Sequence, residues 1–239
     1  MTARREARPP PAPADAAPNR SFPRAVLAGD TLEAGRALLG ARLVRDPVGD
    51  LGRRVGRIVE VEAYVGPDDR ASHARMGPTP RNRVMFGPAG IAYVYLVYGM
   101  HHCLNVVTER EDRPAALLIR AVEAVEGIDA IRASREVVAT RRTRTAGPLS
   151  TPRRVADVRL ASGPGLVAAA FGVDRSFTGM DLCDPASPLR LEARPADETR
   201  PEIIATPRVG IAFAGEPWVS MPWRLTVAGS PSLSGPRAS

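Results

Sequence analysis

The sequence contains no lysine, so all 33 of its basic side chains are arginines. Catalysis through a lysine Schiff base is therefore excluded. Arginine suits phosphate oxygens well, because its planar guanidinium donates two parallel hydrogen bonds. Against 26 acidic residues the formal net charge is +7, and a chain this basic is expected to bind a polyanion.

Cysteine and long apolar runs are also scarce. The two cysteines, Cys103 and Cys183, cannot form a disulfide framework, and the sequence has no CxxC pattern of the kind that binds zinc. The N-terminus lacks the apolar core of a secretory signal, and no apolar run approaches the ~20 residues that span a bilayer. We therefore expect a cytoplasmic protein that has no membrane partner.

Both ends of the chain lack hydrophobic periodicity. Residues 1–21 are rich in proline, alanine and arginine, and residues 230–239 are rich in serine and proline. These compositions predict a disordered N-terminal tail and a flexible C-terminal tail. Residues 22–229 contain no repeat and no internal boundary, so we predict one domain there.

Helix and strand patterns alternate through this domain. A capping box that begins at Asp30 predicts a helix that ends at Gly40. Further helices are predicted at residues 122–135 and 166–171, and the arginine-rich segment 132–159 favours phosphate contact over plain solvation. Period-two alternation and short apolar runs predict strands at residues 41–45, 55–62, 91–97, 101–107, 115–121, 189–193, 208–213 and 223–227.

Two glutamates alternate with valines in the strand predicted at residues 55–62. If Val59 and Val61 face the core, Glu60 and Glu62 share the opposite face. They are either ordinary acids on a solvated strand, or they include a general base.

Arg120 is the single charge in the apolar run AALLIRA. A charge inside an apolar strand is rarely tolerated without a partner. We predict that Glu62 is that partner.

A tyrosine-rich β-hairpin is predicted from the two consecutive strands that meet at residues 98–100. Tyr93 and Tyr95 share one face of the first strand, where we expect Tyr93 to belong to a buried aromatic cluster. Tyr98 and Met100 stand at the tip. An apolar wedge in this position is typical of proteins that insert side chains between stacked bases.

The segment 66–90 has almost no regular pattern. A loop this long inside a compact domain is usually functional. Its Arg81, Asn82 and Arg83 carry donors that suit the phosphates of a DNA backbone. A solvated surface loop explains the same residues equally well.

A basic chain with an aromatic wedge and a nearby carboxylate suggests an enzyme that acts on an extruded base. A zinc deaminase would need HxE and PCxxC motifs, which are absent. A nuclease would need acids clustered around a metal, and here the acids are scattered along the sequence. His101 and His102 point to opposite faces of a strand and cannot easily share one ion, so we predict no metal site. Hydrolysis of the bond between base and sugar remains, with one carboxylate as general base.

Several motifs follow one another in the sequence: EVEAY (60–64), His73, TPRNR (79–83), YVYLVYGM (93–100), Asn105 and LIR (118–120). Together they resemble the alkyladenine (3-methyladenine) DNA glycosylases, over residues 22–229. The resemblance implies one mixed α/β domain around a curved, largely antiparallel sheet, with flanking helices and a protruding hairpin. It also implies a monofunctional enzyme of base excision repair, without metal or other cofactor, that acts as a monomer on double-stranded DNA containing damaged purines.

The resemblance further implies roles for individual residues in hydrolysis and base binding. Glu62 would activate the attacking water, which Arg120 and the main-chain carbonyl of Val209 would hold. Tyr64 and Tyr95 would sandwich the extruded base.

Other residues would select the base and fill the gap that it leaves. The backbone amides of Ala71 and His73 would read the edge of the base, with the His73 side chain closing the pocket. Asn105 would reject the exocyclic amine of guanine by crowding. Tyr98 would enter the duplex, with Met100 beside it.

Two rival functions fit part of the same pattern. A DNA-binding protein of this fold that catalyses nothing would keep the basic surface, but it would have no use for a buried Glu62–Arg120 pair. A hydrolase of small molecules would explain the carboxylate, but it would not explain an exposed Tyr98 at the tip of a hairpin.

Overall fold

The structure is a computed structural model in which residues 20–143 and 155–235 are described, with side chains omitted for residues 137–143. Most of the N-terminal tail predicted at residues 1–21 lies outside these ranges. The same holds for Arg144, Arg153 and Arg154 of the arginine-rich segment.

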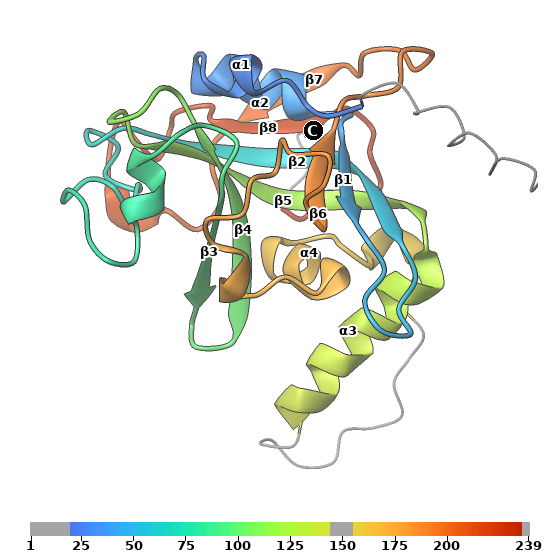
Figure 1. Ribbon diagram of the computed structural model, residues 1–239. Helices are drawn as coiled ribbons and strands as arrows, with labels where there is room; N and C mark the ends of the chain where they lie inside the picture. Colours follow the sequence, from blue (N-terminus) through green and yellow to red (C-terminus); the bar gives the residue numbers. More distant parts are fainter. Residues whose placement is uncertain (1–19, 144–154, 236–239) are drawn as a thin grey trace, which may run out of the picture.

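A curved antiparallel sheet organises the domain (Figure 1). Its strands follow the order β3-β4-β5-β2-β1-β6, while β8 pairs with β2 and β7 pairs with β8. The bounds are β1 (Arg42–Arg45), β2 (Arg54–Val65), β3 (Ala92–Val97), β4 (His101–Thr108), β5 (Ala115–Glu126), β6 (Leu189–Glu192), β7 (Ile203–Thr206) and β8 (Arg224–Val227). The predicted mixed α/β domain around an antiparallel sheet is confirmed.

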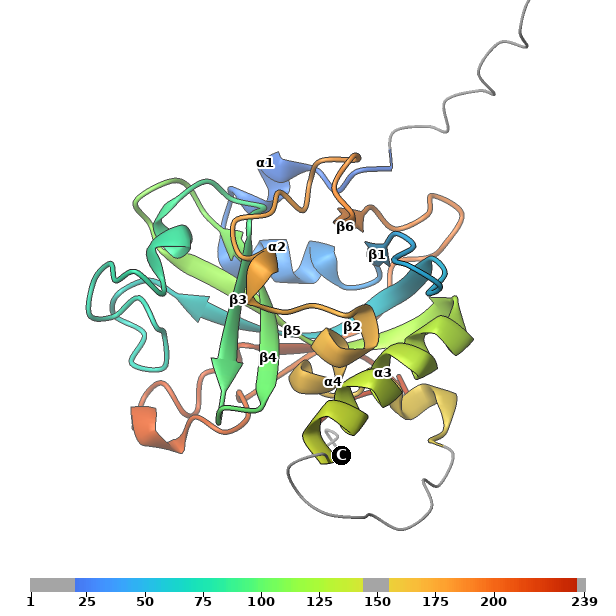
Figure 2. The same ribbon diagram turned by 60° about the horizontal axis from the view of Figure 1, so that its bottom comes forward.

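Helices cover both faces of the sheet (Figures 1 and 2). On one face lie α1 (Arg24–Leu27) and α2 (Thr31–Leu38), and on the other lie α3 (Ile128–Thr143) and α4 (Pro164–Phe171). The predicted cap of α2 is confirmed, because the Asp30 carboxylate accepts hydrogen bonds from the Leu32 and Glu33 amides at 2.9 and 3.0 Å. None of the described helices combines the length and the apolar character that crossing a membrane requires.

One predicted helix begins too early, and one predicted strand is wrong. Residues 122–126 continue strand β5 instead of starting a helix, because they pair with the beginning of β2, and α3 starts only after Gly127. The left-handed backbone of Gly127 (φ 71°) makes the turn between the two. Residues 208–213 form a loop with one short 3-10 turn, and β8 pairs instead with Ile203–Thr206.

The predicted hairpin formed by β3 and β4 protrudes from the sheet (Figure 2). Tyr98 and Gly99 at its tip both have positive φ, 51° and 68°, a backbone that a non-glycine residue adopts only at a cost. The tip is open to solvent, since Tyr98 is 86% exposed and Met100 is 54% exposed. The hairpin therefore presents two large apolar side chains to solvent.

The folded domain does not end at Gly229, although the composition of residues 230–239 predicts a flexible tail there. Leu233 is buried in the main hydrophobic core. Ser230 donates a hydrogen bond to Glu123 of β5 at 2.6 Å, and the Ser234 amide donates to Glu60 of β2 at 2.6 Å. Residues 230–235 are thus packed against the sheet.

We predict that Gly56→Ala lowers the free energy of unfolding by about 1–3 kcal/mol, the usual cost of overpacking a core. A Cβ atom at residue 56 would lie 2.1 Å from a methyl carbon of Val122 and 3.1 Å from the ring of Phe171. Urea denaturation measures the loss. Gly52→Ala is the control, because a Cβ atom there has no neighbour within 4 Å; equal stabilities of the two variants would contradict the packing.

Candidate active site

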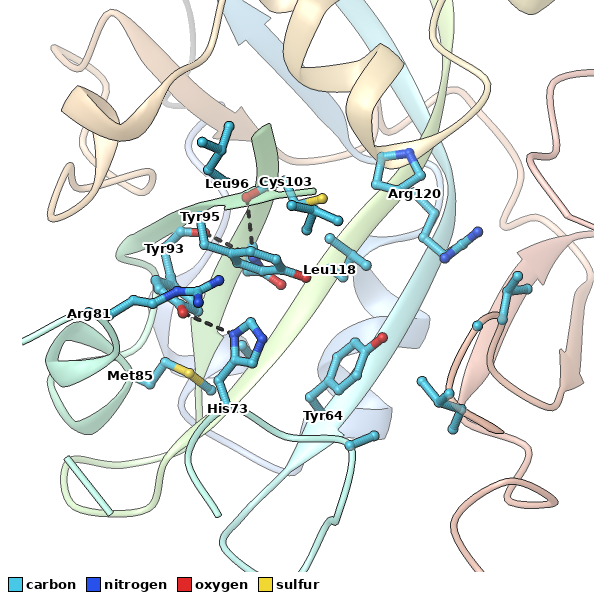
Figure 3. Close-up of a pocket in the computed structure, with 18 of the residues that line it drawn as sticks. Tyr64, His73, Arg81, Met85, Tyr93, Tyr95, Leu96, Cys103, Leu118 and Arg120 are labelled. Atoms are coloured by element: carbon cyan, nitrogen blue, oxygen red, sulfur yellow. Dashed lines mark hydrogen bonds between the residues drawn. The ribbon is translucent and has the colours of Figure 1, made fainter. Parts of the chain in front are cut away.

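A pocket of about 480 Å³ opens between the β3–β4 hairpin, the loop of residues 66–90 and the loop that follows β7 (Figure 3). Aromatic side chains form part of its walls. Tyr64, His73 and Tyr95 surround the space, and Arg81 lies beside Tyr95 (Figure 3).

The back of the pocket is one row of paired residues across the sheet. Neighbours in such a row direct their side chains to the same face. From the edge inward the row consists of Tyr93 (β3), Asn105 (β4), Leu118 (β5), Glu62 (β2) and Arg224 (β8). Antiparallel pairing therefore gathers onto one surface residues that lie far apart in the sequence.

The Glu62 side chain is fully buried just behind the pocket wall. Its Oε1 accepts a hydrogen bond from the Val209 amide at 2.7 Å. Its Oε2 accepts from the Tyr64 hydroxyl at 2.9 Å and from Arg120 Nη1 at 3.2 Å. All three donors belong to residues that line the pocket, so a solvated strand face is excluded and the predicted Glu62–Arg120 pair is confirmed.

Arg120 is shared by two carboxylates, since its Nε donates to Glu60 Oε1 at 2.8 Å. Burial acts to lower the pKa of Arg120, but Glu62 and Glu60 outweigh it, and the pKa is raised. Burial acts to raise the pKa of Glu60, but hydrogen bonds from the Ser234 amide and from Arg224, with the charges of both arginines, lower it. Glu60 and Arg120 are therefore both charged.

The aromatic walls are uncharged at neutral pH. Burial, and next the negative Glu62, raise the pKa of Tyr64 well above its ordinary value. Burial also raises the pKa of Tyr95 and, with Arg81 nearby, lowers that of His73. The His73 ring packs edge-on against Tyr95, with centroids 4.5 Å apart, and its Nδ1 shares a hydrogen bond of 3.0 Å with the Tyr93 hydroxyl.

A buried ion pair fixes the loop that carries the front wall. Both Asp69 oxygens accept hydrogen bonds from Arg208, at 2.6 and 2.9 Å, and both side chains are inaccessible to solvent. Asp69 also accepts from the amides of Val65 and Ala71. The Arg208 guanidinium lies 4.8 Å from the centre of the Tyr64 ring, so a single residue anchors the loop and supports the wall.

The sequence profile of the methylpurine-DNA glycosylase (MPG) family matches residues 25–231. The chain belongs to the methylpurine-DNA glycosylase family. The resemblance read from the sequence motifs is thereby confirmed.

Relatives support the assignment along most of the chain. A protein of Methanocella arvoryzae is 43% identical over 213 residues, which cover 89% of this chain and 95% of the relative. One of Anaeromyxobacter dehalogenans is 43% identical over 216 residues, covering 90% and 87%, and one of Myxococcus xanthus is 43% identical over 213 residues, covering 89% and 93%. Each bears the name "Putative 3-methyladenine DNA glycosylase".

In this member of the methylpurine-DNA glycosylase family, most of the residues predicted for the site lie together around the pocket. Those that line the pocket are Tyr64, Ala71, His73, Arg81, Tyr95, Tyr98, Asn105, Arg120 and Val209. Glu62 lies directly behind them, and Met100 stands at the tip of the hairpin outside the lining.

Asn82 does not fit the predicted contact with a DNA phosphate. Its side chain is buried, and its amide nitrogen donates to the carbonyls of His73 and Gly77, at 2.8 and 3.1 Å. Its oxygen accepts from the amide and the hydroxyl of Thr79. Asn82 therefore shapes the loop, whereas Arg81 and Arg83 beside it are exposed.

Two residues that were predicted to act through their backbone groups make hydrogen bonds that the prediction did not include. The Ala71 amide, expected to read the base, donates to Asp69 at 2.9 Å. Val209, expected to act through its carbonyl, contacts Glu62 through its amide.

Among the described residues no cluster of three or more histidine, cysteine or acidic side chains could hold a metal ion.

The sequence predicted no role for four residues that support the site, Asp69, Arg208, Arg224 and Ser234, and it left Glu60 open as an ordinary acid or a general base. Arg208 and Arg224 each lie next to apolar residues, the signal that identified Arg120, and they could have been found in the same way. Nothing in the composition of residues 230–239 points to Ser234.

We predict that Asp69→Asn lowers the free energy of unfolding by about 3–5 kcal/mol, because it leaves the buried Arg208 cation without its partner. Thermal or urea denaturation measures the loss. Asp157→Asn is the control, since Asp157 pairs with Arg132 at the surface with its side chain 55% exposed, where a pair contributes at most about 1 kcal/mol. Equal losses would show that the burial of Asp69 is irrelevant.

Proposed function

We propose that the protein is a monofunctional DNA glycosylase of base excision repair, which hydrolyses the bond between a damaged purine and its deoxyribose and leaves an abasic site. Family membership supports a DNA glycosylase for alkylated bases. The observation that carries the proposal is the buried Glu62, bonded to Val209, Tyr64 and Arg120 at the back of an aromatic pocket.

Glu62 has the surroundings that a general base needs. A carboxylate offers about four acceptor positions, and the three donors leave one of them, on Oε1, for a water molecule. A carboxylate in this position can take a proton from that water. The same negative charge stabilises the oxocarbenium-like sugar that forms as the base departs.

Access to Glu62 requires a movement, because its side chain has no exposed surface. Tyr64 and Val209 separate it from the cavity, and Val209 lies in the loop that follows β7. We infer that an entering nucleotide displaces one of these two and admits the water.

The pocket suits an extruded base. Tyr64 and Tyr95 offer ring faces for stacking, a contribution of about 1–3 kcal/mol per base. Asn105 lies at the back wall with its amide nitrogen bonded to the Tyr93 carbonyl at 2.9 Å, so its position is rigid enough to exclude a bulky exocyclic group. Within the described chain, the amide of His73 makes no hydrogen bond, which leaves it for the edge of the base.

The exposed hairpin tip supports the insertion of Tyr98 into the space that the base leaves, with Met100 beside it. Arg81 and Arg83, both exposed near the pocket, suit flanking phosphates. We propose that the protein acts as a monomer in the cytoplasm on double-stranded DNA that contains damaged purines.

We predict that Glu62→Gln leaves the affinity for lesion-containing duplex unchanged but reduces base release at least about 100-fold, the usual contribution of a general base. Duplexes carrying 3-methyladenine, 7-methylguanine, hypoxanthine or ethenoadenine are incubated with each variant, and free base and abasic sites are quantified.

Glu192→Gln is the control, because Glu192 also forms an ion pair, with Arg190 of β6, and does not line the pocket. Full activity of Glu62→Gln would refute the mechanism. Lesion-specific binding by the wild-type protein without release of any base would favour the rival function, a DNA-binding protein that catalyses nothing.

We predict that Tyr98→Ala weakens binding to lesion-containing duplex by about 1–3 kcal/mol, the value of one stacking contact. Fluorescence anisotropy measures the affinity, and 2-aminopurine placed opposite or beside the lesion reports base extrusion. Val48→Ala removes another exposed apolar side chain, 45% exposed, outside the pocket lining. An unchanged affinity of Tyr98→Ala would exclude the wedge.

A further inference from the structure

The C-terminal segment reaches the charged centre of the site through Ser234. Its amide donates to Glu60 Oε2 at 2.6 Å, and its hydroxyl donates to Glu60 Oε1 at 2.9 Å. The same hydroxyl oxygen lies 3.0 and 3.2 Å from Nη2 and Nε of Arg120, which donate to it. One serine therefore contacts the carboxylate and the cation of a single buried pair.

The two edges of the Arg120 guanidinium have different partners. The edge formed by Nε and Nη2 is held by Glu60 and Ser234. Only Nη1, on the other side, reaches Glu62, and its distance of 3.2 Å is longer than the 2.8 Å from Nε to Glu60. Glu60 is itself fixed by Arg224, whose Nε lies 2.8 Å from its Oε1.

We propose that Glu60 and Ser234 are positioning residues, which hold Arg120 so that it donates only one hydrogen bond to Glu62. The inference rests on the proposed function, in which Glu62 is the general base. Neither residue lines the pocket itself, whereas Arg120, which both contact, does, so both act through Arg120.

The physical reason lies in the geometry that arginine prefers. A free guanidinium binds a carboxylate with two parallel hydrogen bonds. Arg120 released from Glu60 and Ser234 would turn toward Glu62 and occupy the acceptor position that the water needs.

The burial of the network keeps this arrangement in place. The Glu60 and Glu62 side chains are 0% exposed, and those of Arg120 and Arg224 are 9% and 3% exposed. Two negative and two positive charges balance one another there. Because all four side chains are buried, water competes little for their hydrogen bonds. At metal sites, outer partners that orient a ligand typically contribute about 10–100-fold to affinity or activity, and we expect the same scale for partners that orient Arg120.

The test compares two serines of the same segment. Ser234→Ala removes the hydroxyl that bonds to Arg120 and Glu60. Ser232→Ala is a matched control, because Ser232 is 1% exposed and its hydroxyl has no hydrogen-bond partner among the described residues. Ser234→Thr keeps a hydroxyl on the same carbon. For each variant, the single-turnover rate of base release, the affinity for lesion-containing duplex and the melting temperature are measured.

We expect Ser234→Ala to release base about 10-fold more slowly, with affinity within twofold of the wild type, while Ser232→Ala and Ser234→Thr keep the wild-type rate. Glu60→Gln should show a larger loss of rate at the same affinity. A wild-type rate for Ser234→Ala, or a loss fully explained by weaker binding or unfolding, would overturn the inference and leave the function of Glu62 untouched. A wild-type protein that releases no base would overturn the proposed function, and the inference with it.

Discussion

The structure depends on one arginine that two buried carboxylates share. Arg120 lies between Glu60 and Glu62, and Arg224 balances the second negative charge. Removing one of these charges would leave the net charge of the buried network unbalanced, and an unbalanced buried charge is costly. The network is therefore a structural constraint as well as a chemical device, because the sheet can bury Glu62 only while Arg120 is in place.

The sheet and the loops contribute to the site in different ways. Antiparallel pairing places the residues of the back wall in one row, from Tyr93 to Glu62. The hydrogen bonds between the strands fix the distance from each residue of the row to the next. The front wall lies on loops, which have no such regularity, and the bidentate Asp69–Arg208 pair supplies the missing rigidity. A pocket that must orient a base and a water needs both parts to be preorganised.

Exposure at the mouth of the pocket complements burial behind it. Tyr98 is held at the hairpin tip with a positive φ, and backbone strain of this kind persists where the surrounding structure imposes it. Phe213, which lines the pocket, is also 73% exposed. Bulky apolar side chains thus meet solvent at the place where the proposed DNA substrate would cover them.

Part of this protein could be predicted from local sequence. The pattern of β2 and the lone charge of Arg120 in β5 were enough to predict the Glu62–Arg120 pair, since an apolar strand rarely tolerates an unpaired charge. The hairpin with Tyr98 at its tip, and the family itself, could also be predicted, because turn residues and ordered motifs are local features. By contrast, alternation alone could not distinguish a solvated pair of glutamates from a buried one.

Only the tertiary structure determined which distant residues complete the site. Nothing near Ser234 in the sequence indicates a contact with Glu60, and the exposed position expected for Asn82 was wrong because the loop folds around its side chain. Helical periodicity at residues 122–126 likewise yielded to pairing with β2. The physical reason is the same in each case: local propensity is worth fractions of a kcal/mol per residue, and long-range burial and pairing outweigh it.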